Sequence, residues 1–174
     1  MASGKSTIGK LLASRLGIPF MDTDTIIEKN TGMQIREIFA KRGESYFRSI
    51  ESDLLKELAK TCSQCPRVIA AGGGMPCSEE NLRVMRECGT IVYLETPIDD
   101  IISRIKDSSQ RPVFRRIEKS GNLKDGIEEL LRRREQFYRK AHIIVANPNG
   151  QVPEDTVTKI IQALSEKRSS LKKA

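Results

Sequence analysis

The sequence predicts an α/β domain in which helices cover both faces of a parallel sheet. Short apolar stretches of strand length alternate along the chain with longer stretches of helical periodicity. Each expected strand is separated from the next by a helix, which favours parallel pairing through crossover connections. The length of 174 residues suits one domain that spans residues 1–174.

The first elements follow from apolar spacing and from the position of one glycine. Ile8, Leu12 and Leu16 share one face of a helix that Gly17 ends. A short strand over residues 18–21 then leads into a polar run. After it we expect three helices, over residues 25–30, 34–42 and 44–60.

The second half of the chain continues the alternation. Helices are expected over residues 78–87, 97–106, 125–140 and 153–164, and strands over residues 68–71, 90–94 and 142–145. Ser78 is the expected N-cap of the first of these helices, and Pro97 opens the second.

Two stretches depart from this pattern. Residues 108–124 are polar and basic and lie between two helices. A long polar loop inside a compact domain is typically functional, so we expect a mobile lid there. Residues 165–174 form a basic tail that we expect to be frayed and solvated.

The charge balance narrows the class of partner. The formal net charge is +7, from 30 Lys and Arg against 23 Asp and Glu, which favours anionic ligands. Aromatic residues make up 5% of the chain with no Trp, too few for a protein that stacks on single-stranded bases. Because no stretch of about 18 apolar residues is present, we expect no membrane span and a cytoplasmic location.

The cysteines and the single histidine give little indication of a metal, redox or catalytic role. Cys62 and Cys65 form a C-x-x-C, but no second pair of cysteines or histidines completes a zinc site. We therefore expect four reduced thiols, which include Cys77 and Cys88. His142 opens an apolar run, and we expect it to be a partly buried structural residue.

The strongest local signal lies at the start of the chain, where Gly4-Lys5-Ser6 matches the end of a phosphate-binding loop. Backbone N–H groups in such a loop hold phosphate oxygens, and the following helix presents its positive N-terminus to them. Lys5 would reach the β- and γ-phosphates, and Ser6 would bind Mg²⁺. The alternative is a helix start that matches by chance.

The remainder of that motif falls before Met1. Counting back from Gly4, both the first motif glycine and the strand that precedes such loops lie upstream of the sequence. We therefore expect an N-terminally truncated copy, a mis-assigned start or a degenerate homologue.

Further candidate residues follow the expected strands, at the edge where parallel sheets bind ligands. Of Asp22 and Asp24, one carboxylate suits Mg²⁺ and the other suits a substrate hydroxyl, whose proton it could accept. The alternative is a helix N-cap, with Asp24 before the helix at 25–30. The glycines at 72–74 indicate either a close backbone approach to a ligand or a flexible turn.

Several arginines could meet an anion. Arg48 lies on a helix and could equally be a solvated surface residue. Residues 132–134 are consecutive arginines on a helix, so at most one or two can face inward. The arginines of the polar loop could close over phosphates; they are Arg111, Arg115 and Arg116.

Together these stretches resemble shikimate kinase. The resemblance covers G-K-S-T-I-G-K-L-L-A at 4–13, P-F-M-D-T-D at 19–24, T-G-M-Q-I-R-E-I-F at 31–39, G-E-S-Y-F-R-S-I-E at 43–51, V-I-A-A-G-G-G at 68–74, I-V-Y-L at 91–94, R-P at 111–112 and R-E-Q-F-Y-R at 134–139. It implies a three-layer P-loop nucleotide-kinase fold and the reaction ATP + shikimate → ADP + 3-phosphoshikimate, with Mg²⁺, in aromatic amino-acid biosynthesis.

The resemblance also implies roles for individual residues. Lys5, Asp24 and Arg111 would be catalytic, with Asp24 as the base and Arg111 as the lid arginine. Mg²⁺ would be held by Ser6 and by Asp22. The nucleotide would contact Ala2, Ser3, Gly4, Lys5, Ser6, Thr7, Arg104, Arg111 and Pro153, with Arg104 stacked on the adenine. Shikimate would contact Asp24, Arg48, Gly72, Gly73, Gly74 and Arg134.

Three other hypotheses stay open on sequence grounds. The first is another small-metabolite or nucleotide kinase, which should lack Asp24, Arg48 and the three glycines together. The second is a non-catalytic binding protein or fragment of this family. The third is a nucleic-acid-binding module, which should show a basic stripe with interleaved aromatic residues. We expect a monomer that binds a small molecule and neither nucleic acid nor membrane.

Overall fold

The structure, a computed structural model, describes residues 2–106 and 123–171. Its helices are α1 (Lys5–Leu16), α2 (Thr23–Thr31), α3 (Ile35–Ala59), the 3₁₀ turn η1 (Met75–Cys77), α4 (Glu79–Cys88), α5 (Ile98–Lys106), α7 (Leu123–Tyr138) and α8 (Pro153–Leu171). Its strands are β1 (Phe20–Asp22), β2 (Val68–Ala70), β3 (Val92–Glu95) and β4 (Ile143–Ala146). The lid expected at 108–124 lies almost wholly outside the described residues.

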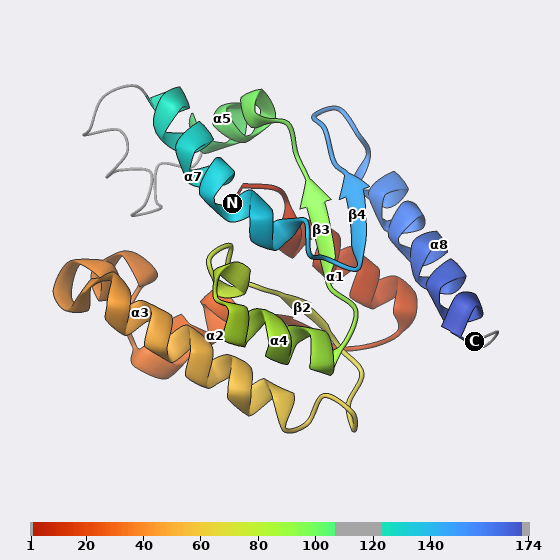
Figure 1. Cartoon of the computed structure of the whole chain (residues 1–174), viewed down its shortest axis with the longest axis horizontal. Coiled ribbons are helices and arrows are strands. Elements are labelled where there is room, and N and C mark those ends of the chain that lie inside the picture. The colour runs from red at the N-terminus through yellow and green to blue at the C-terminus, as the bar shows by residue number, and fades with distance from the viewer. Residues whose placement is uncertain (1, 107–122, 172–174) are drawn as a thin grey trace.

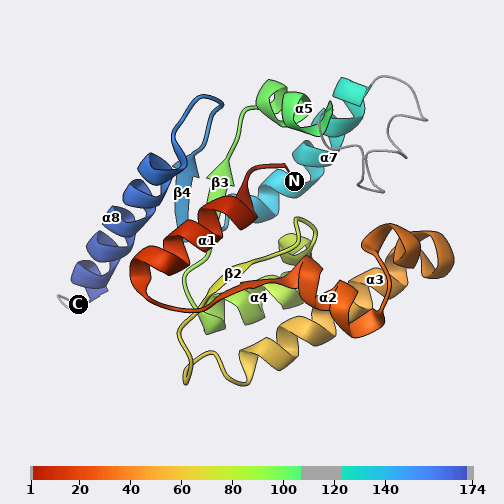
Figure 2. The same ribbon diagram turned by 180° about the vertical axis from the view of Figure 1, so that it is seen from behind.

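The strands run parallel, as predicted, and they lie between two layers of helices. Helices α1 and α8 cover one face of the strands, and α3, α4 and α7 lie on the other (Figures 1 and 2). The predicted α/β class with helices on both faces is therefore confirmed. Among the described residues, none of the helices has the length and hydrophobicity needed to cross a bilayer.

The described strands form two pairs rather than the one continuous sheet that we expected. β1 pairs with β2, and β3 pairs with β4. Helix α1 joins the two pairs through the core. Its residues Ile8 and Leu12 pack in one apolar cluster with Leu94 of β3 and Val145 of β4, and Val68 of β2 packs against the same cluster.

Glycines allow two close approaches in this arrangement. A Cβ at Gly9 would lie 2.7 Å from the ring of Phe20, so α1 can pack directly onto β1 only because that position has no side chain. In α3, Gly43 has φ 81° and ψ 174°, which breaks the helix into the two segments that the sequence predicted.

The last helix differs from the prediction. α8 continues to Leu171, whereas the sequence predicted a helix ending at residue 164 and a frayed tail from residue 165. Polar side chains of these turns bond along the helix. Ser165, Ser169 and Ser170 each donate a hydrogen bond to the carbonyl four residues earlier, and Gln162 donates to Glu166.

His142 has the structural role that we expected. Its Nδ1 accepts a hydrogen bond from the backbone N–H of Ile91 at 3.0 Å, which ties the start of β4 to the segment before β3. Burial, with Lys167 and Arg86 nearby, holds the pKa of His142 below its usual value of 6.5.

This contact makes folding stability depend on pH. Protonation of Nδ1 would break the bond to Ile91. Because the folded-state pKa is lowered, the contribution of His142 is present above about pH 6.5 and is lost as the pH falls below it. The free energy of unfolding is measured in urea at about pH 7.5 and at about pH 5.5. Between these values it should fall less in His142→Asn than in the unaltered chain, because the side-chain oxygen of asparagine accepts from Ile91 at both pH values. An equal fall in both proteins would contradict this role.

Candidate active site

The phosphate-loop segment has a backbone of mixed handedness before its helix. Helix α1 begins at Lys5, directly after Gly4, which has the left-handed backbone of φ 78° and ψ 15°. Ala2 also has a positive φ, of 48°, so Ser3 lies between two residues with a left-handed backbone just before the helix. This backbone turns successive N–H groups toward one side, and no acidic residue lies in the first turn of α1 to oppose an anion there.

Ser6 and Asp22 come together at the same end of the sheet. The Ser6 hydroxyl donates to Oδ2 of Asp22 at 2.5 Å, and Oδ1 of Asp22 accepts from the N–H of Asp24 at 3.0 Å. Asp22 is therefore the N-cap of α2, and Asp24 is the acidic residue of its first turn. The two carboxylates thus also have the capping role that the sequence offered as the alternative, with the cap at Asp22 rather than at Asp24. A hydroxyl and a carboxylate at this spacing suit the oxygen coordination of Mg²⁺.

Asp24 lies at a second cluster, built around the glycines after β2. A Cβ at Gly72 would lie 3.0 Å from Oδ1 of Asp24 and 2.5 Å from Oε1 of Glu51. A Cβ at Gly74 would overlap the guanidinium of Arg48. Gly72 and Gly74 therefore leave room for charged side chains of the protein itself, which is where the close backbone approach expected from the sequence is seen.

Glu51 is the most buried charged group of this cluster, with 1% of its surface exposed. Its Oε2 pairs with Nη1 of Arg48, whereas its Oε1 has no hydrogen-bond partner. Burial raises the pKa of Glu51, while Arg48 opposes that shift and Asp24 adds to it. Arg48 is therefore held on both sides. The buried Glu51 pairs with its Nη1, and the more exposed Glu44 pairs with its Nη2 through Oε1 at 3.0 Å.

Arg134 completes the cluster from α7. It is 8% exposed, whereas Arg132 and Arg133 point outward and pair with Glu129. Arg134 is close enough to lower the pKa of Glu51 and bonds to Tyr138, whose hydroxyl donates to the carbonyl of Gly73 at 2.6 Å. Burial raises the pKa of Tyr138 to about 12, so it remains a neutral donor. Two cations and an aspartate therefore surround the backbone of residues 72–74.

The predicted adenine contacts lie near the loop, on α5 and at the start of α8. Arg104 donates to the carbonyls of Ala2 at 3.3 Å and Asn147 at 3.4 Å and to Oδ1 of Asn149 at 2.8 Å. Pro153 is exposed at the first position of α8. Arg111, Arg115 and Arg116 lie outside the described residues.

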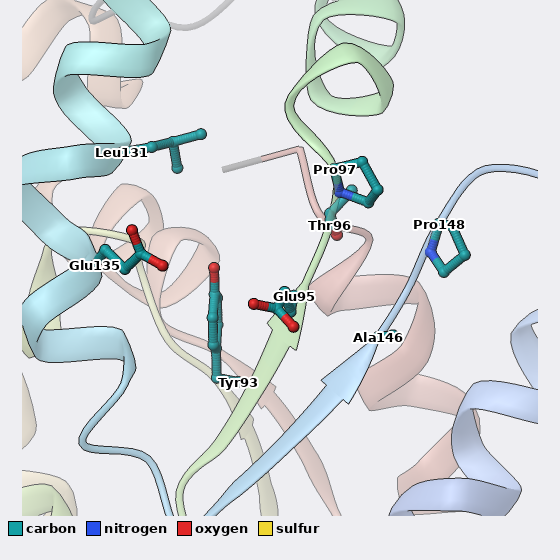
Figure 3. A pocket seen from close by; sticks show the side chains of 8 residues that line it. All are labelled: Tyr93, Glu95, Thr96, Pro97, Leu131, Glu135, Ala146 and Pro148. Atoms are coloured by element: carbon teal, nitrogen blue, oxygen red, sulfur yellow. The ribbon is translucent and has the colours of Figure 1, made fainter.

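A cavity of about 500 Å³ is lined by residues of β3 and α7. Figure 3 shows Glu95 of β3 and Glu135 of α7 pointing into it, beside Tyr93. Tyr93, which lines this cavity, packs on Tyr138, with ring centroids 5.0 Å apart. The two carboxylates of the cavity, both paired with Arg139, make it unsuited to an anionic substrate.

Sequence reasoning missed Glu51, Tyr138 and Asn147 as site residues. Glu51 could have been found, because it stands one turn after Arg48 in a helix whose positions 47, 54, 55 and 58 are buried and apolar. Tyr138 lies in the motif at 134–139 but has no signal of its own. Asn147 follows the strand expected at 142–145, and no spacing or charge pattern singles it out.

A P-loop fold with these two neighbouring clusters defines a class of protein. Such proteins bind a nucleoside triphosphate at the loop and transfer a phosphoryl group to a small acceptor held by the second cluster.

Comparison with known proteins gives the particular family. The family model described as Shikimate kinase matches residues 1–165. A shikimate kinase of Persephonella marina is 37% identical over 161 residues, 92% of each chain, and one of Aquifex aeolicus is 39% identical over 164 residues, 94% of this chain and 91% of its own.

Solved structures agree with this result. The crystal structure of the Aquifex aeolicus shikimate kinase superposes with a TM-score of 0.80 at 38% identity, covering 97% of this chain and 94% of that one. A shikimate kinase from Acinetobacter baumannii in complex with shikimate gives 0.86 at 34% identity, covering 96% and 89%. The chain belongs to the shikimate kinase family, whose members are ATP-dependent phosphotransferases. The resemblance and the three-layer fold expected from the sequence are confirmed.

Proposed function

We propose that this chain transfers the γ-phosphate of ATP to the 3-hydroxyl of shikimate. One observation carries the proposal: Asp24 and the cations Arg48 and Arg134 all interact with the buried Glu51, next to Gly72, and Ser6 of the phosphate loop bonds to Asp22. Shikimate has one carboxylate and three hydroxyls. Charge-assisted bonds from the arginines suit the carboxylate, and an aspartate suits a hydroxyl.

The residues then divide the chemistry. Arg48 and Arg134, with N–H groups around Gly73, hold the substrate carboxylate. Asp24 orients the hydroxyl and accepts its proton as the oxygen attacks the γ-phosphorus. Lys5 and the N-terminus of α1 stabilise the charge on the transferring phosphoryl group, and the positive charge of Arg111, which lies outside the described residues, does the same.

The remaining residues bind the nucleotide and the metal. The backbone of residues 2–7 holds the phosphates, and Arg104 and Pro153 flank the adenine. Ser6 would supply an oxygen ligand for Mg²⁺ and Asp22 would hold the ion through water, and the bound ion would neutralise phosphate charge. We further propose that the protein works as a cytoplasmic monomer that binds neither nucleic acid nor membrane.

The test is ADP release in a coupled assay with Mg-ATP and shikimate, with gluconate and nucleoside monophosphates as control acceptors. Turnover with shikimate alone would support the proposal. Turnover with another acceptor would overturn the substrate assignment. Shikimate binding without turnover, in a chain that circular dichroism shows to be folded, would favour the non-catalytic alternative.

Removal of one metal ligand gives a narrower prediction. Ser6→Ala should raise the Mg²⁺ concentration needed for half-maximal activity by about tenfold, because one good oxygen ligand is worth roughly 1–2 kcal/mol. The measurement is a Mg²⁺ titration of the shikimate-dependent rate. Ser165→Ala, an exposed change on α8, is the control. An unchanged requirement in Ser6→Ala would remove Ser6 from the metal site.

A further inference from the structure

Asn147, the residue after β4, lies directly behind the phosphate loop. It is 6% exposed, and both ends of its side-chain amide are used. Nδ2 donates to the carbonyl of Ser3 at 2.8 Å, and Oδ1 accepts from the hydroxyl of Thr156 at 3.0 Å. Nδ2 also lies 3.7 Å from the Cβ position of Gly4.

The bond to Ser3 fixes the orientation of a peptide unit. In a planar trans peptide, the carbonyl of Ser3 and the N–H of Gly4 point in opposite directions. When Asn147 holds that carbonyl behind the loop, the N–H of Gly4 must point to the front, where an anion would lie. The reversed peptide would present an oxygen to that anion instead. Arg104 acts in the same way on the preceding unit, because it holds the carbonyl of Ala2.

The support for Asn147 is itself buried and bonded. Thr156 is fully buried, and its hydroxyl accepts from Nε2 of Gln151 at 2.7 Å while donating to Asn147. Because Thr156 donates to Oδ1, the amide of Asn147 is oriented with its nitrogen toward Ser3. The backbone of Asn147 is held as well, by its N–H to the carbonyl of Glu95 at 2.8 Å.

We propose that Asn147 is a positioning residue for the nucleotide phosphates, which it serves by holding the Ser3–Gly4 peptide with its N–H toward them. This inference rests on the proposed function in that the natural ligand is ATP. The inference concerns only the part of the site that binds phosphates. A change at Asn147 should therefore weaken phosphate binding without weakening adenine binding.

The experiment uses inorganic tripolyphosphate and adenosine as separate probes, each titrated calorimetrically with Mg²⁺ present. Asn147→Asp retains an acceptor for Thr156 but replaces the donor to Ser3 with an oxygen. Its dissociation constant for tripolyphosphate should rise by at least about tenfold, with less than about twofold change for adenosine. In the assay, KM for ATP should rise and KM for shikimate should not. Asn30→Asp, the same chemical change at an exposed position of α2, is the matched control.

Each outcome decides between the hypotheses. A tripolyphosphate affinity within twofold of the unaltered chain, or equal losses for both probes, would overturn the inference. If Asn147→Asp does not fold by circular dichroism, Asn147→Ala is judged by the same limits. Strong tripolyphosphate binding by an unaltered chain that does not phosphorylate shikimate would leave the inference standing and sink the proposed function. No tripolyphosphate binding by the unaltered chain would sink both.

Discussion

Replacing Asp24 with asparagine is expected to lower kcat for shikimate by about 10²–10⁴-fold, the usual contribution of a positioned general base. The amide has nearly the shape of the carboxylate but cannot accept the proton that the hydroxyl loses. Asp24 lies against Gly72 and Glu51 at the end of β2, so the side chain should keep its place. KM for shikimate should therefore change far less than kcat.

The measurement is kcat and KM from steady-state rates over a range of shikimate concentrations. Asp53→Asn, an exposed change on α3, is the control for the loss of one negative charge. A variant with more than a tenth of the normal kcat would rule out Asp24 as the base.

Replacing Arg48 with methionine should have two separable effects. KM for shikimate should rise by about 10- to 100-fold, because a charge-assisted contact to the substrate carboxylate is lost. The protein should also lose about 3 kcal/mol of stability, since Glu51 keeps its charge in a buried site without a partner. That loss should shrink as the pH falls, because the raised pKa of Glu51 lets it take up a proton.

A second substitution separates the two effects. In Arg48→Met combined with Glu51→Met, both members of the buried pair are removed, so the free energy of unfolding in urea should recover most of the loss; the remainder reflects Arg134, which loses the nearby charge of Glu51. KM for shikimate should stay high. If KM recovers together with stability, Arg48 supports the fold and does not contact the substrate.

The sequence predicted those parts of the site that depend on local spacing. Lys5, Ser6 and Asp22 lie where a phosphate loop and a strand end should put them, and Arg134 proved to be the buried member of its run. The roles expected for these residues follow from the residues next to them in the sequence.

The parts that sequence reasoning missed depend on contacts between distant residues. Asn147 meets Ser3 across 144 positions, and Tyr138 meets Gly73 across 65. No local sequence pattern predicts either of these long-range contacts. The length of α8 was underestimated for another reason: its last turns are polar and basic, and such residues indicate a tail unless the side-chain bonds along the helix are known.

The position of helix α1 should affect how fast the protein is degraded by proteases. The same helix that begins at the phosphate loop also packs against both strand pairs, so a ligand at its N-terminus stabilises the element on which the core depends. Ligand at about 100 times its dissociation constant stabilises a folded protein by roughly 2.7 kcal/mol. Digestion by a protease that cuts only opened chains should therefore slow about a hundredfold in saturating nucleotide, so degradation would depend on the supply of ATP.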